Sequence, residues 1–278
     1  MKIVRGIPEM QALRRELKGS VGLVPTMGYL HRGHMALVGK SQEFNAFTIV
    51  SMFVNPTQFG PQEDFAKYPR DEQHDIKLLE DAGVDVLFIP SADEMYPDGF
   101  DSWVEVRGIT DTLEGARRTW HFLGVATICN KLFNITAPHR AYFGQKDAQQ
   151  VQVVRKMVRD LNMSIEIDVV PTIREEDGLA MSSRNTYLSI DERRAAAVLY
   201  KALLKAREMC AFGERDAKKI TGGMTAILQS EPLVKVDYVA ITDSGSLQEI
   251  EYIQSSALVS MAVFIGRTRL IDNITVTV

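Results

Sequence analysis

The sequence has very few cysteines, and their scarcity excludes a disulfide-rich secreted domain. Cys129 and Cys210 are the only two cysteines among 278 residues. Small secreted domains need several cysteine pairs because their cores are too small to hold the fold alone. Both cysteines lie in apolar stretches of helical character, so we expect two buried thiols in a reducing cytosol rather than a Cys129–Cys210 disulfide.

Long hydrophobic runs are also missing. Charged residues occur at Lys2, Arg5 and Glu9, before any apolar run long enough for a secretory signal peptide. No stretch approaches the ~20 consecutive apolar residues that would span a bilayer. We therefore expect a cytoplasmic protein with no membrane partner.

The chain has no strong excess of one charge. Lys and Arg number 32, Asp and Glu number 36, and the net charge at pH 7 is −4. Because these charges are spread along the chain, they create no global field that attracts a polyanion, and nucleic acid is not an expected partner. With 45% hydrophobic residues, the chain can bury a large core in one domain or in two unequal ones.

From residue 21 onward, short apolar runs alternate with longer amphipathic ones, which is typical of a doubly wound α/β fold with a parallel sheet. The expected strands are 21–24, 48–54, 84–89, 140–143 and 165–170, and the expected helices are 35–42, 71–82, 124–136 and 148–161. After Pro171 the pattern changes to helices at 191–211 and 217–228 and strands at 236–241 and 258–265. We expect a Rossmann-like domain over residues 1–172 and a smaller α+β domain over residues 173–278.

The first motif follows the buried strand 21–24 and opens a helix. Gly28 and Gly33 lie where the backbone must turn or approach a ligand closely, and His31 and His34 lie between and beside them. A helix N-terminus offers unpaired N–H groups and a positive dipole end, so it binds phosphate. The three-residue spacing brings both imidazoles near one face, where they could bracket phosphates and stabilise the charge that develops as pyrophosphate departs.

Two other interpretations of this motif are open. In one, a histidine caps the helix and the other is an ordinary surface residue. In the other, His-x-x-His binds zinc, but no nearby Cys, Asp or Glu completes the ligand shell. The glycines and the strand-turn-helix context favour the phosphate site.

The second motif is a polar loop over residues 174–185, centred on Met181-Ser182-Ser183-Arg184. It follows the last strand of the first domain, where ligands of open α/β sheets gather. Two hydroxyls and a guanidinium can donate several hydrogen bonds to phosphate oxygens. The alternative is a surface loop that caps the helix beginning near Asp191.

Together the two motifs predict a clamp on a triphosphate, and in this combination the chain resembles the nucleotidylyl transferase superfamily. Further segments, in order along the chain, narrow the resemblance to the pantoate-beta-alanine ligase family. They are Pro25-Thr-Met-Gly28, Leu30-His31-x-Gly33-His34, Phe53-Val-Asn-Pro-x-Gln-Phe59, Tyr68-Pro-Arg70, Phe143-Gly-Gln-Lys-Asp-Ala-Gln-Gln150, Asp177-Gly-Leu-Ala-Met-Ser-Ser-Arg-Asn185 and Arg269-Leu-Ile-Asp-Asn273.

The resemblance implies a reaction, partners and a set of site residues. Pantoate would attack ATP to give pantoyl adenylate and pyrophosphate, and the amine of beta-alanine would then displace AMP. ATP would enter with Mg²⁺ held largely by phosphates and water, with no protein ligand assigned, and the protein would be a homodimer. The implied ATP-binding residues are Met27, Gly28, Tyr29, Leu30, His31, Arg32, Gly33, His34, Gly144, Gln145, Lys146, Asp147, Ile173, Met181, Ser182, Ser183 and Arg184, of which His31, His34, Lys146 and Arg184 would be catalytic.

Asn55, Gln58 and Gln150 are the candidate substrate-binding residues. Asn55 and Gln58 follow the strand 48–54, where neutral amides can bind a hydroxy acid without repelling its carboxylate. The family resemblance assigns Gln58 and Gln150 to pantoate, with beta-alanine beside Gln58. Without the resemblance, Asn55-Pro56 would be a plain turn and Lys146-Asp147 a surface ion pair.

The chain departs from the family pattern at one place. Members of the family usually have Arg-Pro-Gly-His, whereas Thr119 and Trp120 stand between Arg118 and His121 here. A Trp in place of a Gly could alter the turn that presents His121 or crowd the acid pocket. The rival hypotheses are a nucleotidylyl transferase that acts on another small acceptor, an aminoacyl-tRNA synthetase, and a nucleotide sensor without catalytic activity.

Overall fold

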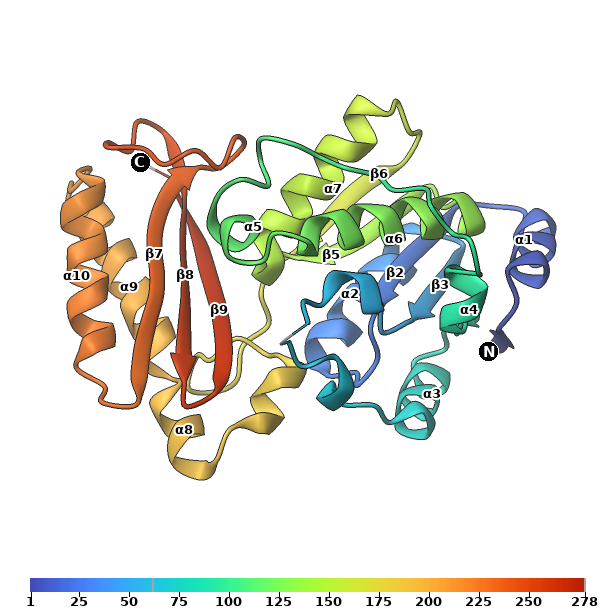
Figure 1. Ribbon diagram of the computed structural model, residues 1–278, viewed down its shortest axis with the longest axis horizontal. Helices are drawn as coiled ribbons and strands as arrows, with labels where there is room; N and C mark the ends of the chain where they lie inside the picture. The colour runs from blue at the N-terminus through green and yellow to red at the C-terminus, as the bar shows by residue number, and fades with distance from the viewer. Residues whose placement is uncertain (62, 278) are drawn as a thin grey trace. The chain divides into compact units, whose positions relative to one another are not determined.

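The computed structural model describes residues 1–61 and 63–277 of the chain (Figure 1). The chain forms two compact units. The first comprises Met1–Gln145 and Gln150–Pro171, and the second comprises Lys146–Gln149 and Thr172–Val278. Each unit has its own sheet.

The first unit is built on a six-stranded parallel sheet with the strand order β1-β4-β3-β2-β5-β6. Its strands are β1 (Lys2–Val4), β2 (Val21–Thr26), β3 (Phe47–Met52), β4 (Val86–Phe88), β5 (Arg140–Gly144) and β6 (Glu166–Val170). The central strands are almost entirely buried and rich in Val and Ile, as expected when helices cover both faces of a parallel sheet. The predicted doubly wound α/β fold is confirmed.

Helices flank this sheet, and several begin at a side chain that accepts a hydrogen bond from the first turn, as at Asp71 and Ser91. The helices are α1 (Ile7–Glu16), α2 (Arg32–Phe44), α3 (Glu72–Asp81), α4 (Ala92–Met95), α5 (Leu113–Arg117), α6 (His121–Thr136) and α7 (Ala148–Asp160). Three short 3₁₀ helices, η1 (Pro56–Gln58), η2 (Phe65–Lys67) and η3 (Gln145–Asp147), complete the connections.

The strand order reverses between β2 and β5, which are hydrogen-bonded neighbours although they are distant in sequence. From β2 the chain proceeds to β3 and β4 on one side, and it later returns to β5 and β6 on the other. Ligands of open α/β sheets bind at such a reversal, beyond the carboxyl ends of the strands. The residues that follow β2, β3 and β5 therefore lie where such ligands bind.

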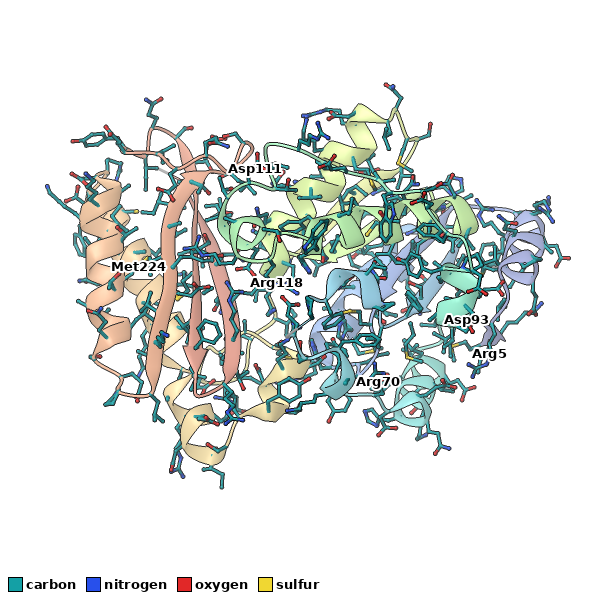
Figure 2. All side chains as sticks on the ribbon, in the orientation of Figure 1. Arg5, Arg70, Asp93, Asp111, Arg118 and Met224 are labelled. Atoms are coloured by element: carbon teal, nitrogen blue, oxygen red, sulfur yellow. The ribbon has the colours of Figure 1, made fainter. Side chains whose placement is uncertain are left out.

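The second unit contains a three-stranded antiparallel sheet, β7-β8-β9, and three helices. Its strands are β7 (Val234–Asp243), β8 (Ser256–Ile265) and β9 (Thr268–Thr277), and its helices are α8 (Ile190–Ala195), α9 (Val198–Ala211) and α10 (Ala217–Gln229), with a 3₁₀ helix η4 (Ser183–Tyr187) before them. Figure 2 labels Met224, a buried residue of α10 that belongs to a core shared with Leu203 and Met261. The predicted α+β character of this part of the chain is confirmed.

Some elements differ from the sequence-based expectations. The single helix expected over 191–211 is two helices, α8 and α9, separated at Ala196 and Ala197. The structure adds elements that the hydrophobic pattern did not predict, among them β1, α1 and β9. Both cysteines are free and buried. None of the helices in the described part of the chain has the length and apolar character needed to cross a bilayer.

Candidate active site

The turn after β2 is held by a buried carboxylate. The backbone N–H groups of Tyr29 and Leu30 donate to the two oxygens of Asp75 on α3, at 2.6 and 2.7 Å. Asp75 is only 1% exposed, and burial raises the pKa of its carboxyl although the two backbone hydrogen bonds oppose the shift. Gly28 precedes this turn with a φ of 80°, and an added Cβ would meet Met52 and Asp75 at 3.1 and 3.2 Å. The turn therefore requires glycine at this position.

His31 and His34 lie together at the N-terminus of α2, with ring centroids 4.1 Å apart. Nδ1 of His31 accepts from the backbone N–H of Gly33 at 3.1 Å, and Nδ1 of His34 accepts from the backbone N–H of His31 at 3.3 Å. The two histidines thus form a reciprocal capping box. The capping interpretation is correct, and it applies to both rings rather than to one.

These caps determine the protonation state of both imidazoles. An Nδ1 atom that accepts a hydrogen bond carries no proton, so each ring is neutral and has its proton on Nε2. A neutral Nε2–H group can donate to an anion. The capping role and a phosphate-binding role therefore use different nitrogen atoms and are compatible.

Asn55 and Gln58 follow β3 and are both buried. Asn55 caps η1, and its Nδ2 atom donates to Gln58 Oε1 and to the backbone oxygen of Gly124, both at 3.2 Å. Gln58 Nε2 lies 3.2 Å from the sulfur of Met27, in the turn after β2. Asn55 and Gln58, two of the three predicted substrate residues, therefore lie next to the turn after β2 in the first unit.

The end of β5 has an accessible backbone at Gly144, and a charged pair, Lys146 and Asp147, follows it. Apart from its two neighbours in the chain, no described residue has an atom within 4 Å of a Cβ added at Gly144, so a ligand could approach this backbone closely. Lys146 Nζ lies 3.7 Å from Asp147 Oδ1, so the two residues form an ion pair, but the Lys146 side chain is only 19% exposed. Gln150 is half-buried in the first turn of α7.

In the second unit, a buried ion pair supports the segment that carries Lys146. Arg174 donates to Asp272 on β9 through two hydrogen bonds of 2.6 and 3.0 Å, and it also donates to the backbone oxygen of Gly178 at 3.0 Å. Asn273, the next residue on β9, donates through Nδ2 to the backbone oxygen of Lys146 at 2.8 Å. The strand β9 thus holds Lys146 and the start of the polar loop.

The polar loop has an ordered backbone. The backbone N–H of Met181 donates to the oxygen of Ile173 at 2.9 Å, and Ser182 Oγ accepts from the backbone N–H of Arg184 at 3.3 Å, which caps η4. Asp177 forms an ion pair with Arg193 of α8. The alternative in which this loop caps that helix is wrong, because Ser189 and Glu192 form the capping box of α8 themselves.

The backbone at Trp120, where the family usually has a glycine, has a conformation that does not require glycine. Trp120 has φ −96° and ψ −10°, which any residue adopts, and its side chain is 66% exposed. The neighbouring His121 is half-buried. Burial lowers its pKa to about 4, with the charge of Arg118 acting in the same direction, so the ring is neutral near pH 7.

Comparison with known proteins identifies the relatives of this chain. A family model described as pantoate-beta-alanine ligase matches residues 2–275. The pantothenate synthetase of Acetivibrio thermocellus is 54% identical over 281 residues, covering 100% of each chain. The chain belongs to the pantoate-beta-alanine ligase family. The reaction of this family is the ATP-dependent condensation of pantoate with beta-alanine, and the chain is a ligase of this type.

Solved structures agree with this assignment. The pantothenate synthetase from Thermus thermophilus superimposes with a TM-score of 0.95 at 48% identity, covering 99% of each chain. The pantoate-beta-alanine ligase from Francisella tularensis, complexed with beta-gamma ATP and beta-alanine, gives a TM-score of 0.82 at 35% identity, covering 99% of this chain and 97% of that one. The resemblance that the motifs predicted is confirmed.

Sequence reasoning missed several residues that hold candidate site residues in place within their own unit, chiefly Asp75, Asp272 and Glu63. Asp75 did carry a signal, because it lies four residues before Leu79 on the buried face of α3, where an acidic residue needs a partner. Asp272 lies on β9, which was not predicted as a strand because polar residues interrupt its apolar pattern. Glu63 carried no signal, because its partner Arg118 is 55 residues away.

Proposed function

We propose that this ligase works through a pantoyl adenylate. The carboxylate of pantoate attacks the α-phosphorus of ATP, and the bond to the β-phosphate breaks to release pyrophosphate. The amine of beta-alanine then attacks the acyl carbon, and AMP leaves. Neither step needs a nucleophile from the protein, so positioning and stabilisation of developing negative charge supply most of the catalysis.

The observation that carries this proposal is the pair of neutral imidazoles at the N-terminus of α2. The Nε2–H groups of His31 and His34 donate to phosphate oxygens and stabilise the charge that grows as pyrophosphate departs. The positive end of the helix dipole acts in the same direction. Because Nδ1 of each ring is occupied by the helix cap, the donors are oriented before the substrate arrives.

The nucleotide site comprises the turn after β2, the segment after β5 and the polar loop. Lys146 supplies a point charge to the phosphates, Asp147 binds the ribose hydroxyls or orients Lys146, and Arg184 supplies a bidentate donor. The ATP-binding set is Met27, Gly28, Tyr29, Leu30, His31, Arg32, Gly33, His34, Gly144, Gln145, Lys146, Asp147, Ile173, Met181, Ser182, Ser183 and Arg184. In this proposal residues 1–172 bind the nucleotide and pantoate, and residues 173–278 act as a lid domain that brings the polar loop to the phosphates.

Pantoate binds to Asn55, Gln58 and Gln150, and beta-alanine binds beside Gln58. Neutral amides suit this role because they can hydrogen-bond a hydroxyl and a carboxylate without an excess of charge. The buried position of Asn55 and Gln58, next to Met27, supports the proposal. The Francisella tularensis relative, which was crystallised with beta-alanine, supports a beta-alanine site in the family.

Mg²⁺ enters as the ATP complex and is held by phosphates and water, which is its usual manner of binding in nucleotide sites. The described residues include no group of three His, Cys, Asp or Glu side chains placed to hold a metal ion, so we assign no protein ligand.

We further propose a cytoplasmic homodimer. Two buried free thiols suit a reducing compartment, and sedimentation should give twice the chain mass of 31.1 kDa.

Exchange of labelled pyrophosphate into ATP tests the adenylate directly. We expect exchange only when pantoate is present, and pantothenate and AMP as products once beta-alanine is added. Release of ADP and phosphate would contradict the proposal. A nucleotide sensor would bind ATP without any exchange, and a transferase of another acceptor would show exchange with its own acceptor but not with pantoate.

Substitution at His34 separates catalysis from helix capping. His34→Gln keeps an acceptor at the third helical position, as a capping box requires, but removes the imidazole. We expect both His34→Gln and His34→Ala to slow exchange by about 10²–10³-fold, the usual effect of losing one transition-state donor. Lys146→Ala should slow exchange to a similar extent. Of the two His34 variants, only His34→Ala should lower the melting temperature, and normal exchange in His34→Gln would show that this histidine merely caps α2.

A further inference from the structure

Gln58 is held by its backbone as well as by its side chain. Its carbonyl oxygen accepts a hydrogen bond of 2.9 Å from His121 Nδ1 and one of 3.3 Å from Arg118 Nη2. A carbonyl oxygen has no proton to donate, so the neutral ring of His121 carries its proton on Nδ1. Both donors come from the segment that opens α6, at least 60 residues further along the chain.

Arg118 is itself fixed by Glu63. Its Nε and Nη2 atoms donate to the two carboxylate oxygens at 2.7 and 2.6 Å, and the side chains are only 16% and 27% exposed. Burial alone would raise the pKa of Glu63, but the hydrogen bonds and charge of Arg118 hold it below its usual value. Figure 2 labels Arg118, which directly follows α5. The guanidinium thus joins Glu63 to the backbone of Gln58.

The side-chain carboxamide of Gln58 is held by Asn55. Asn55 Nδ2 donates to Gln58 Oε1, and Asn55 Oδ1 accepts from the hydroxyl of Tyr96 at 2.8 Å. The backbone of Gly124 lies directly against η1, since an added Cβ would come within 2.7 Å of the backbone nitrogen of Gln58. The first turn of α6 therefore supports the entire η1 turn.

We propose that Arg118 and His121, with Glu63 behind them, are positioning residues that aim the carboxamide of Gln58 at the hydroxyl of pantoate and so determine selectivity for a hydroxy acid. The inference rests on the proposed binding of pantoate by Gln58. Arg118 and His121 act through the Gln58 backbone and touch no reacting atom. A site that hydrogen-bonds a substrate hydroxyl discriminates strongly against an analogue without it, but only if the donor is held in place.

The test measures the KM of each substrate in pantoate-dependent pyrophosphate exchange and in the complete reaction. In His121→Ala we expect the KM for pantoate to rise about tenfold, because one hydrogen bond to a buried carbonyl is lost. The KM for ATP should stay within about twofold, since the proposed phosphate-binding residues Lys146 and Arg184 are not on η1, and the KM for beta-alanine, which is proposed to bind beside Gln58, should rise less than that for pantoate. His121→Asn should recover most of the loss, because its Nδ2 atom lies the same number of bonds from the backbone as His Nδ1.

Arg118→Lys tests the same inference at the second positioning residue. Lysine keeps a positive charge beside Glu63 but lacks the planar fork that reaches both Glu63 and the Gln58 carbonyl, so the KM for pantoate should again rise the most. The selectivity for pantoate over the corresponding acid without its hydroxyl should fall in both variants. Trp120→Ala is the matched control, since this exposed side chain lies between the two positioning residues and should leave all three KM values unchanged.

A double-mutant cycle with Gln58→Ala distinguishes a failure of the proposed substrate site from a failure of the positioning inference alone. If His121 acts through Gln58, His121→Ala should change the KM for pantoate by less than about twofold in the Gln58→Ala background. A Gln58→Ala variant with a normal KM for pantoate would overturn the proposed substrate site and this inference together. If Gln58→Ala raises that KM but His121→Ala does not, or if all three KM values rise equally, only the positioning inference fails.

Discussion

At the scale of single residues, His121 is a histidine that stays neutral although charged groups surround it. The facing charges are those of Arg118, Glu63 and Glu114, and burial is the main reason that its pKa falls from 6.5 to about 4. The neutral form is the one that fits its surroundings, since Arg118 already supplies a positive charge beside it. In the unfolded chain the same ring is exposed to water, and its pKa is the ordinary 6.5.

The stability of the protein should therefore depend on pH through this residue. Between the two pKa values the unfolded chain binds a proton that the folded chain does not, so the folded state loses stability as pH falls from about 6.5 towards 4. From pH 7 to pH 5 the loss due to His121 should be about 1–2 kcal/mol. Urea unfolding of the wild type and of His121→Asn over this range measures it as the difference between the two curves.

The range above pH 5 is chosen because Glu63, with its lowered pKa, loses its stabilising charge only below its ordinary value of 4.5. Parallel stability curves for the wild type and His121→Asn would show that the ring titrates normally in the folded protein. The same measurement on Trp120→Ala provides a control that leaves the titrating ring intact.

The residues of the candidate site could be predicted from sequence when their signal was local. His31 and His34 were identified by a three-residue spacing after a strand, and the structure brings the two rings together. Asp75 could not be identified in the same way, because the backbone N–H groups that it binds have no side-chain signature and lie 45 residues or more away. Main-chain partners of this kind become visible only in three dimensions.

At the scale of elements, the contact between α6 and η1 is the tightest one near Asn55 and Gln58. A methyl group at Gly124 would lie 2.5 Å from the backbone oxygen of Thr57 and 2.7 Å from the backbone nitrogen of Gln58. Real Cβ atoms do not approach backbone so closely, so one of the two elements must shift. The α6 helix carries a large buried face, which makes η1 the element that is easier to displace.

Gly124→Ala should therefore destabilise the protein and weaken pantoate binding together. Overpacking of this kind costs about 1–3 kcal/mol, and the KM for pantoate should increase more than that for ATP. Gly39→Ala is the matched control, because Gly39 lies on the exposed face of α2 with no atom within 4 Å of an added Cβ. That change should be neutral or slightly stabilising, since alanine favours helix. Equal effects of the two substitutions on KM would contradict the close contact.

The elements that the sequence did not predict each lacked a local signal. The break between α8 and α9 falls at Ala196 and Ala197, which are strong helix formers, so no glycine or proline marks it. The strand β9 contains the polar residues Asp272 and Asn273 at buried positions, which interrupt the apolar pattern of a strand. Their polarity is explained by partners elsewhere in the second unit, not by their neighbours in sequence.

At the scale of the whole molecule, each unit has its own hydrophobic core. In the second unit, helices α9 and α10 and the three strands share a core that includes Leu199, Ile220 and Val259. The Arg174–Asp272 pair is a charged feature of this unit, with the Asp272 side chain fully buried. Burial raises the pKa of Asp272, and the ion pair to Arg174 opposes that shift.

Removal of one partner from this pair should loosen the second unit selectively. Asp272→Asn leaves the Arg174 guanidinium largely buried without its counter-charge, which costs about 3–5 kcal/mol in typical buried pairs. Amide hydrogen exchange should become faster in β7, β8 and β9 than in β2, β3 and β5, because local opening depends on the stability of each cooperative unit. Asp237→Asn, at an ion pair with Arg269 that is partly exposed on both sides, is the control. Uniform acceleration in both sheets would show that the two units open together.

The assignment of Lys146–Gln149 to the second unit affects how this ligase can be dissected genetically. The polypeptide changes unit at three points, after Gln145, after Gln149 and after Pro171, so no single cut separates the units. A truncated chain that ends at residue 171 would keep Lys146 but lose Asn273, the residue that anchors its main chain. Chimeras made from two relatives should therefore exchange residues 146–149 along with the C-terminal half, because Lys146 and Asn273, which holds its main chain, belong to the same unit.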